Sequence, residues 1–116
     1  MKKITMIAVF LALFVSFTAA QPEVTEVNLN PSNPDIGEQV EVTAEAQGYN
    51  LDYIEAKMPR ESQFESRNCG FTCDNFDNPW TFTPDSAGSY TVEVKAGQIL
   101  GEESDTVSKT ITVEGE

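Results

Sequence analysis

The stretch Pro84-Asp85-Ser86-Ala87-Gly88-Ser89-Tyr90-Thr91-Val92-Glu93-Val94 decides the fold of this chain. Its first half, Asp85 to Gly88, is rich in residues that favour turns. Its second half alternates strictly, so that Tyr90, Val92 and Val94 share one face of a β-strand. The pattern predicts a strand that begins at a tight turn. The layout resembles a tyrosine corner, which implies that the hydroxyl of Tyr90 folds back onto the backbone of the preceding loop.

The same period-2 alternation recurs along the chain, whereas helical periodicity is absent after residue 20. Short alternating segments are separated by residues typical of turns, such as Asn30-Pro31-Ser32-Asn33-Pro34-Asp35. Besides the Tyr90 strand, we expect strands at Val24–Leu29, Glu38–Ala46, Ile54–Met58, Gln63–Ser66, Trp80–Thr83 and Val107–Val113.

Seven short strands and a tyrosine corner at Tyr90 predict an all-β, seven-stranded immunoglobulin-like sandwich with Greek-key connections. One sheet should hold the first two strands and the Trp80 strand, and the other the strands of Ile54, Tyr90 and Ile111. The expected core consists of Val27, Leu29, Val40, Val42, Ala44, Ile54, Ala56, Trp80, Phe82, Tyr90, Val92, Val94, Ile111 and Val113.

The segment from Val24 to Val113 resembles the immunoglobulin-like modules of bacterial and archaeal cell-surface proteins, such as the CARDB and PKD groups. The resemblance rests mainly on residues 30–40 and 80–94. Val92 stands where an antibody-type domain has a cysteine, and the Trp-Asp-Phe-Gly-Asp motif of PKD domains is missing. The resemblance therefore favours a generic immunoglobulin-like module. It implies a spacer, stalk or binding unit rather than an enzyme.

Residues 1–20 have the features of a signal peptide. Lys2 and Lys3 precede an apolar stretch, and Thr18-Ala19-Ala20 supplies small residues before a cleavage site. An uncleaved membrane anchor is the alternative, but the apolar stretch is shorter than the roughly 20 residues that span a bilayer. We expect residues 21–116 to form one domain, secreted or at the cell surface and without membrane insertion after cleavage.

Acidic residues dominate the composition. Residues 21–116 contain all 19 acidic residues but only five basic ones, a formal net charge of −14. Nucleic acid is excluded as a partner, because binding to phosphates needs a basic patch, and anionic membranes are disfavoured for the same reason. The acidity indicates either cation binding or a solvated surface, such as one adapted to high salt. The even spread of the acids favours the solvated surface.

Cys69 and Cys73 are the only cysteines, and in a secreted chain such a pair is expected to form a disulfide. Redox chemistry would favour a Cys-x-x-Cys motif at a helix N-terminus, and a zinc site would need about four ligands in a chain that has no histidine. Closing so short a loop should contribute roughly 2 kcal/mol of stability.

In the expected topology the cysteine loop lies at one pole of the sandwich, beside the loops around residues 47–50 and 97–104. That pole carries the binding loops of antibodies. The candidate binding residues there are Tyr49, Phe71, Phe76, Ile99 and Leu100. Adjacent Ile99 and Leu100 in a glycine-flanked loop are the least expected, because one of the two should face solvent. Phe71 and Phe76 could instead cap the core.

Acidic residues cluster at the same pole. Calcium takes six to eight oxygen ligands, which loops between strands can supply. The candidate ligands are Asp74, Asp77, Glu102, Glu103 and Asp105. The segment from Asp74 to Asn78 lacks the spacing of an EF-hand, so calcium is a possible cofactor and no other cofactor is indicated.

Catalytic machinery is hard to assemble from this composition. There is no histidine to act as a general base and no Gly-x-Ser-x-Gly motif. The sequence therefore predicts a non-catalytic binding or adhesion module that recognises a protein or glycan at the cell surface. The alternative is a structural subunit of a surface layer or filament that docks through its sheet edges. The sequence does not indicate an oligomeric state.

Overall fold

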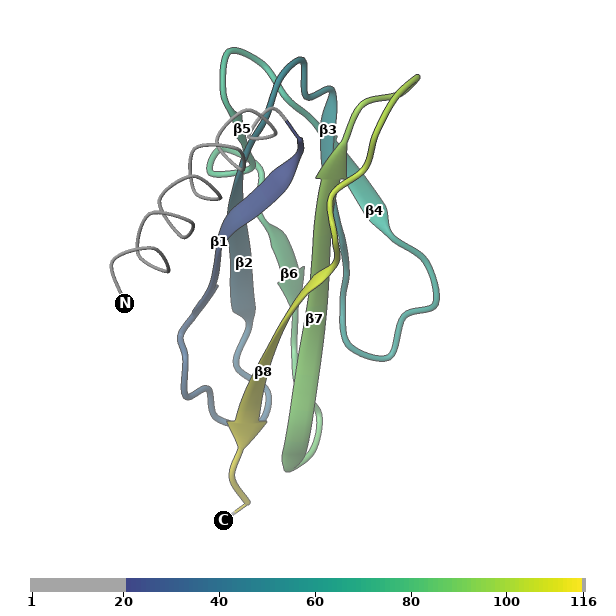
Figure 1. Cartoon of the computed structure of the whole chain (residues 1–116). Coiled ribbons are helices and arrows are strands. Elements are labelled where there is room, and N and C mark those ends of the chain that lie inside the picture. The colour runs from purple at the N-terminus through teal and green to yellow at the C-terminus, as the bar shows by residue number, and fades with distance from the viewer. Residues whose placement is uncertain (1–20, 116) are drawn as a thin grey trace, which may run out of the picture.

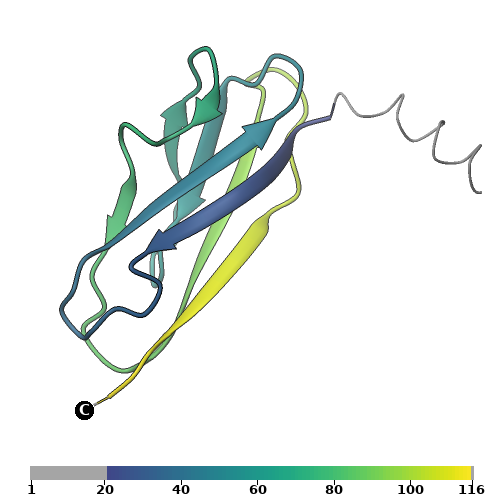
Figure 2. The same ribbon diagram turned by 90° about the vertical axis from the view of Figure 1, so that its left-hand side faces the viewer.

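A computed structural model describes residues 21–115, which form two antiparallel four-stranded sheets packed face to face (Figures 1 and 2). The predicted signal peptide lies outside the described residues. Within residues 21–115 no helix is long and apolar enough to cross a membrane.

The first sheet is built around β2 (Val40–Gln47), which pairs with β1 (Glu23–Asn30) on one side. On its other side β2 pairs with two short strands in succession, β5 (Cys73–Asp74) and β6 (Trp80–Phe82).

The second sheet has the order β4-β3-β7-β8. Its strands are β4 (Glu65–Asn68), β3 (Tyr53–Lys57), β7 (Gly88–Gly97) and β8 (Val107–Val113). The all-β immunoglobulin-like fold and the assignment of strands to the two sheets are as predicted from the alternation.

Residues 21–115 form eight strands rather than the expected seven. The additional strand is β5, whose two residues lie in the cysteine-rich segment, where no alternation marks a strand. The predicted edge strand at Gln63–Ser66 is also displaced, because the residues that pair with β3 are Glu65–Asn68. Phe64 instead lies just before the strand, with the ammonium group of Lys95 4.5 Å from its ring centroid.

A β-bulge explains the broken alternation of β1. The pairing register with β2 shifts between Val24 and Glu26, so that Thr25 is the additional residue. As a result Val24 and Val27 both face the core although they are three residues apart.

The predicted core is buried, with Phe82 partly buried and stacked on Tyr90 at 6.0 Å between ring centroids. Trp80 is the largest fully buried side chain, and its indole nitrogen donates a hydrogen bond to the carbonyl of Glu65 at 2.9 Å. Because Trp80 belongs to the first sheet and Glu65 to the second, this bond joins the two layers.

The hydroxyl of Tyr90 donates a hydrogen bond of 2.7 Å to the carbonyl of Ser86, and the Ser86 amide donates to the same hydroxyl at 3.3 Å. This is the tyrosine corner. Arg60, from the loop after β3, adds a contact that the sequence did not reveal. Its guanidinium donates to the Tyr90 hydroxyl, lies over the ring and pairs with Asp85 at 2.7 Å.

Asn75 is a buried polar residue that completes the first sheet. Its side-chain oxygen accepts a hydrogen bond from the Ala44 amide at 2.8 Å, and its side-chain nitrogen donates to the Val42 carbonyl at 3.0 Å. The amide side chain therefore occupies the gap between β5 and β6 and pairs with β2 as a peptide group would.

Replacing Tyr90 with phenylalanine should lower the free energy of unfolding by about 1–2 kcal/mol, because the Ser86 carbonyl loses its donor. Tyr49→Phe is the matched control, since Tyr49 is exposed and its hydroxyl makes no hydrogen bond within residues 21–115. Urea unfolding of both variants measures the difference. An unchanged midpoint for Tyr90→Phe would show that the corner bond contributes nothing.

Replacing Asn75 with alanine should destabilise the domain by about 2–3 kcal/mol, because the buried Ala44 amide and Val42 carbonyl both lose their partner. Asn78→Ala is the control, because that side chain is exposed and, within residues 21–115, the hydrogen bonds at Asn78 involve only its backbone. Thermal unfolding of the two variants should differ clearly, and equal melting temperatures would contradict the role of Asn75.

Candidate functional site

Three loops meet at the end of the sandwich opposite the C-terminus (Figure 1). They are residues 48–52 between β2 and β3, residues 69–72 between β4 and β5, and residues 98–106 between β7 and β8. We call this end the loop pole. The cysteine loop therefore lies beside the two other loops, at the pole where the sequence placed it.

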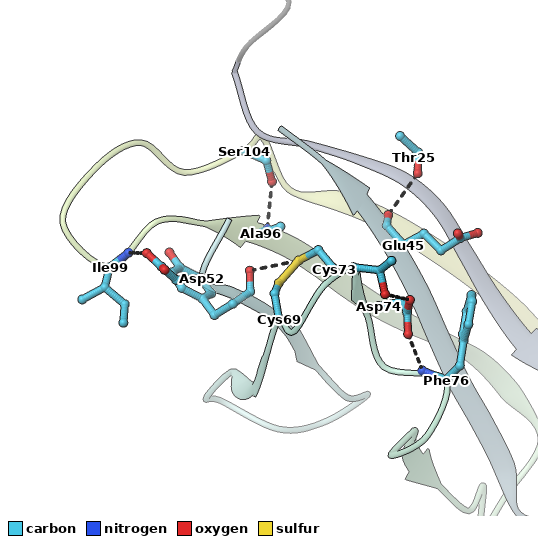
Figure 3. Close-up of a disulfide and its surroundings, with 12 residues drawn as sticks. Thr25, Glu45, Asp52, Cys69, Cys73, Asp74, Phe76, Ala96, Ile99 and Ser104 are labelled. Carbon is cyan, nitrogen blue, oxygen red and sulfur yellow. Dashed lines mark hydrogen bonds between the residues drawn. A yellow bond between two sulfur atoms is a disulfide. The ribbon is translucent and has the colours of Figure 1, made fainter. Parts of the chain in front are cut away.

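Cys69 and Cys73 form a disulfide at the loop pole (Figure 3), as predicted. Cys73 begins β5 in the first sheet, whereas Cys69 directly follows β4 in the second. The bridge therefore closes the chain where it crosses from one sheet to the other, and it restricts the backbone on both sides of Phe71.

Asp52 ties the three loops together. Its amide donates to the Gly97 carbonyl at 2.9 Å, and its own carbonyl accepts from the Cys69 amide at 3.0 Å. Its carboxylate accepts a hydrogen bond of 2.8 Å from the amide of Ile99 (Figure 3). One residue of the 48–52 loop thus contacts both the cysteine loop and the 98–106 loop.

Gln98 adds a second connection between the loops. Its side-chain nitrogen donates to the Tyr49 carbonyl at 2.6 Å, and its side-chain oxygen accepts from the Glu102 amide at 3.3 Å. The Gln98 amide also donates to the Glu102 carbonyl at 2.9 Å. The segment that carries Ile99 and Leu100 is therefore a closed turn anchored to its neighbour.

The base of the 98–106 loop is fixed by a polar cluster on β3 and β7. The Tyr53 hydroxyl donates to Glu103 at 2.6 Å, and the Lys95 ammonium lies 3.2 Å from the other oxygen of that carboxylate. These contacts hold the pKa of Glu103 below its ordinary value, with the Tyr53 hydrogen bond as the main cause. Gly97 leaves room for the cluster, because a side chain there would collide with the Tyr53 hydroxyl.

The loops expose large apolar side chains to water. Phe71 and Leu100 are almost completely exposed, and Tyr49 and Ile99 keep about 70% of their surface accessible. Phe71 therefore does not cap the core. Phe76 is half exposed and lies on the other side of the disulfide from Ile99 (Figure 3), in the segment between β5 and β6. The other four candidate residues are carried by the three connected loops.

Phe71 stands between two open hollows lined mainly by polar groups. Asn50 and Thr72 are among the residues that line the first, and Asn68 and Asp77 are among those that line the second. Neither hollow is a deep cleft, and the exposed ring of Phe71 is the most prominent apolar feature at this position.

The five candidate calcium ligands do not converge. Asp74 accepts hydrogen bonds from the Thr72 hydroxyl and the Phe76 amide, and Glu103 is engaged by Tyr53 and Lys95. Asp77, Glu102 and Asp105 are exposed on their loops. Within residues 21–115 no three acidic or cysteine side chains come together as a metal site. Calcium binding therefore stays a prediction of the sequence alone.

Comparison of the chain with models of known protein families finds no match, and no curated protein matches it. Among solved structures it is similar to the PKD domain of an M14-like peptidase from Thermoplasmatales archaeon SCGC AB-540-F20. The identity is 25% and the TM-score is 0.56, over 82% of this chain and 94% of that chain. Despite lacking the Trp-Asp-Phe-Gly-Asp motif, this chain is a PKD-like, immunoglobulin-like β-sandwich module.

Proposed function

We propose that this protein is a non-catalytic binding module, secreted or at the cell surface, that recognises its partner through the loop pole. One observation carries the proposal. Tyr49, Phe71, Ile99 and Leu100 are exposed on three loops. Hydrogen bonds of Asp52 and Gln98 join these loops, and a disulfide closes the cysteine loop. An extracellular location is supported by the disulfide and by the PKD-like fold.

Apolar side chains on connected loops have the properties of a binding surface. Fully exposed phenylalanine and leucine add nothing to the core, whereas covering them by a partner is favourable by about 25 cal/mol for each Å² of apolar surface. Loops that are already ordered lose less conformational entropy on binding than free loops do. The hydrogen bonds of Asp52 and Gln98 therefore favour association as well as local structure.

The alternative, a filament or surface-layer subunit that pairs through sheet edges, is less well supported. The bulge at Thr25 interrupts β1, and Lys109 lies exposed on β8. The edge strands on the other side, β4, β5 and β6, have only two to four residues each. Bulges, lysines and short edge strands are the features by which proteins prevent edge-to-edge pairing.

Replacing Phe71 and Leu100 together with serine should abolish retention of the purified protein on cells of the organism that produces it. Ile36→Ser is the matched control, because Ile36 is 42% exposed in the loop between β1 and β2, at the opposite end. Retention of labelled protein on the cells is the measurement, and the melting temperatures of the variants should stay close to that of the wild type.

Equal retention of the wild type and the Phe71→Ser/Leu100→Ser variant would contradict the proposal. If both proteins also assembled into the same polymer, the structural-subunit alternative would take its place.

Asp52→Ala should weaken retention through loss of loop order, and Asp52→Asn should restore it, because an amide oxygen can still accept from Ile99. Hydrogen exchange of the Ile99 amide should become about tenfold faster in Asp52→Ala, as expected for the loss of one exposed hydrogen bond. If the alanine and asparagine variants were retained equally, the carboxylate of Asp52 would not position the loop.

A further inference from the structure

The distribution of charge at the loop pole indicates what kind of partner fits it. We propose that the partner is a protein that presents an apolar pocket bordered by lysine and arginine side chains. This inference rests on the proposed function, because it concerns the same exposed side chains.

The loop pole is acidic and contains no basic residue. The three loops of the loop pole, together with the adjoining residues 73–79, include six aspartates and glutamates but no lysine or arginine. Three of these acids, Glu102, Glu103 and Asp105, follow Leu100 within five positions. The charged groups that border the exposed apolar side chains are therefore all negative.

Most of these carboxylates have no cation beside them in the folded domain. Within residues 21–115 only Glu103 among the six forms an ion pair, with Lys95 at 3.2 Å. Asp52 and Asp74 accept hydrogen bonds from uncharged groups. Asp77, Glu102 and Asp105 are exposed, and no ion pair forms at any of them within the same residues.

The basic residues near the loop pole already have partners within the domain. The guanidinium of Arg67 pairs with Glu65 at 2.6 Å and donates to the Asn78 carbonyl, and Lys95 lies between Glu55 and Glu103. Of these six carboxylates the domain therefore neutralises that of Glu103 alone and supplies no cation for the other five within residues 21–115.

Desolvation determines which partner can cover such a surface. Burying Leu100 brings Glu102 to the rim of the interface, where a carboxylate without a partner is costly. A cationic rim on the partner supplies that missing charge and accelerates association. A second copy of this chain would place carboxylates against carboxylates, and an anionic lipid surface would place other negative groups against them. Repulsion between like charges therefore disfavours both partners.

Selection of peptides from a random 12-residue library displayed on phage, with the purified protein as bait, tests this inference. Selected sequences should combine aromatic or aliphatic residues with lysine or arginine. As free peptides they should bind roughly tenfold more weakly when the salt concentration rises from about 0.05 to about 0.5 M. Leu100→Ser should abolish their binding.

Matched charge variants separate local from overall electrostatics. Glu102→Gln/Asp105→Asn should weaken peptide binding several-fold, whereas Glu41→Gln/Glu114→Gln, which removes two charges far from the loop pole, should leave it unchanged. Equal effects of the two double variants would show that only the overall net charge matters, and would overturn the inference.

The remaining outcomes distinguish the two proposals. Peptides without basic residues that still depend on Leu100 would overturn the cationic partner but retain the loop pole as the binding surface. Peptides that bind the Leu100→Ser variant as well as the wild type would contradict the proposed function itself. Failure to select any peptide, or Leu100-dependent binding to phosphatidylcholine vesicles alone, would overturn a protein partner.

Discussion

The pairing of β2 with β5 and β6, along the edge away from β1, holds the rest of the domain in place. Two short strands share that edge, and the side chain of Asn75 keeps the hydrogen-bond ladder continuous between them. The chain can therefore leave β4 in one sheet, cross the pole through the disulfide-closed loop and return in the other sheet as β5. The chain then continues to β6, where Trp80 is buried in the core and its indole nitrogen donates a hydrogen bond to the Glu65 carbonyl of β4. The exposed position of Phe71 is a consequence of this crossing.

Much of the fold could be predicted because most core residues lie at alternate positions along their strands, so that apolar and polar residues alternate in the sequence. Tyr90, Val92 and Val94 are buried on one face, and the turn before them closes the corner through Ser86. Period-2 patterns identify long strands well, because the polarity of each residue indicates whether it faces the core or the solvent. The cysteine pair was equally clear, because no other cysteine is present to compete. Two adjacent apolar residues in a short loop cannot both face inward, so the exposure of one of Ile99 and Leu100 could be predicted, whereas the structure exposes both.

The features that could not be predicted are contacts between residues far apart in sequence. Asn75 binds Val42 and Ala44 more than 30 residues away, and Asp52 binds Ile99 at a separation of 47. Aspartate and asparagine are common in turns, so neither residue stood out. Strand β5 is too short for alternation to appear. Topology placed the acidic candidates near one pole but could not predict their contacts: the structure assigns Glu103 to a cluster with Tyr53 and Lys95.

The proposed function requires a loop pole that is ordered before any partner arrives. Backbone ¹⁵N relaxation of the free protein tests it most directly, through the order parameters of the Phe71, Ile99 and Leu100 amides. Values close to those of the strands, about 0.8 or higher, are predicted, because Asp52 and Gln98 connect the three loops and the disulfide closes the cysteine loop. Values below about 0.6 would show that the loops move independently on the fast timescale, and would contradict a preformed binding surface.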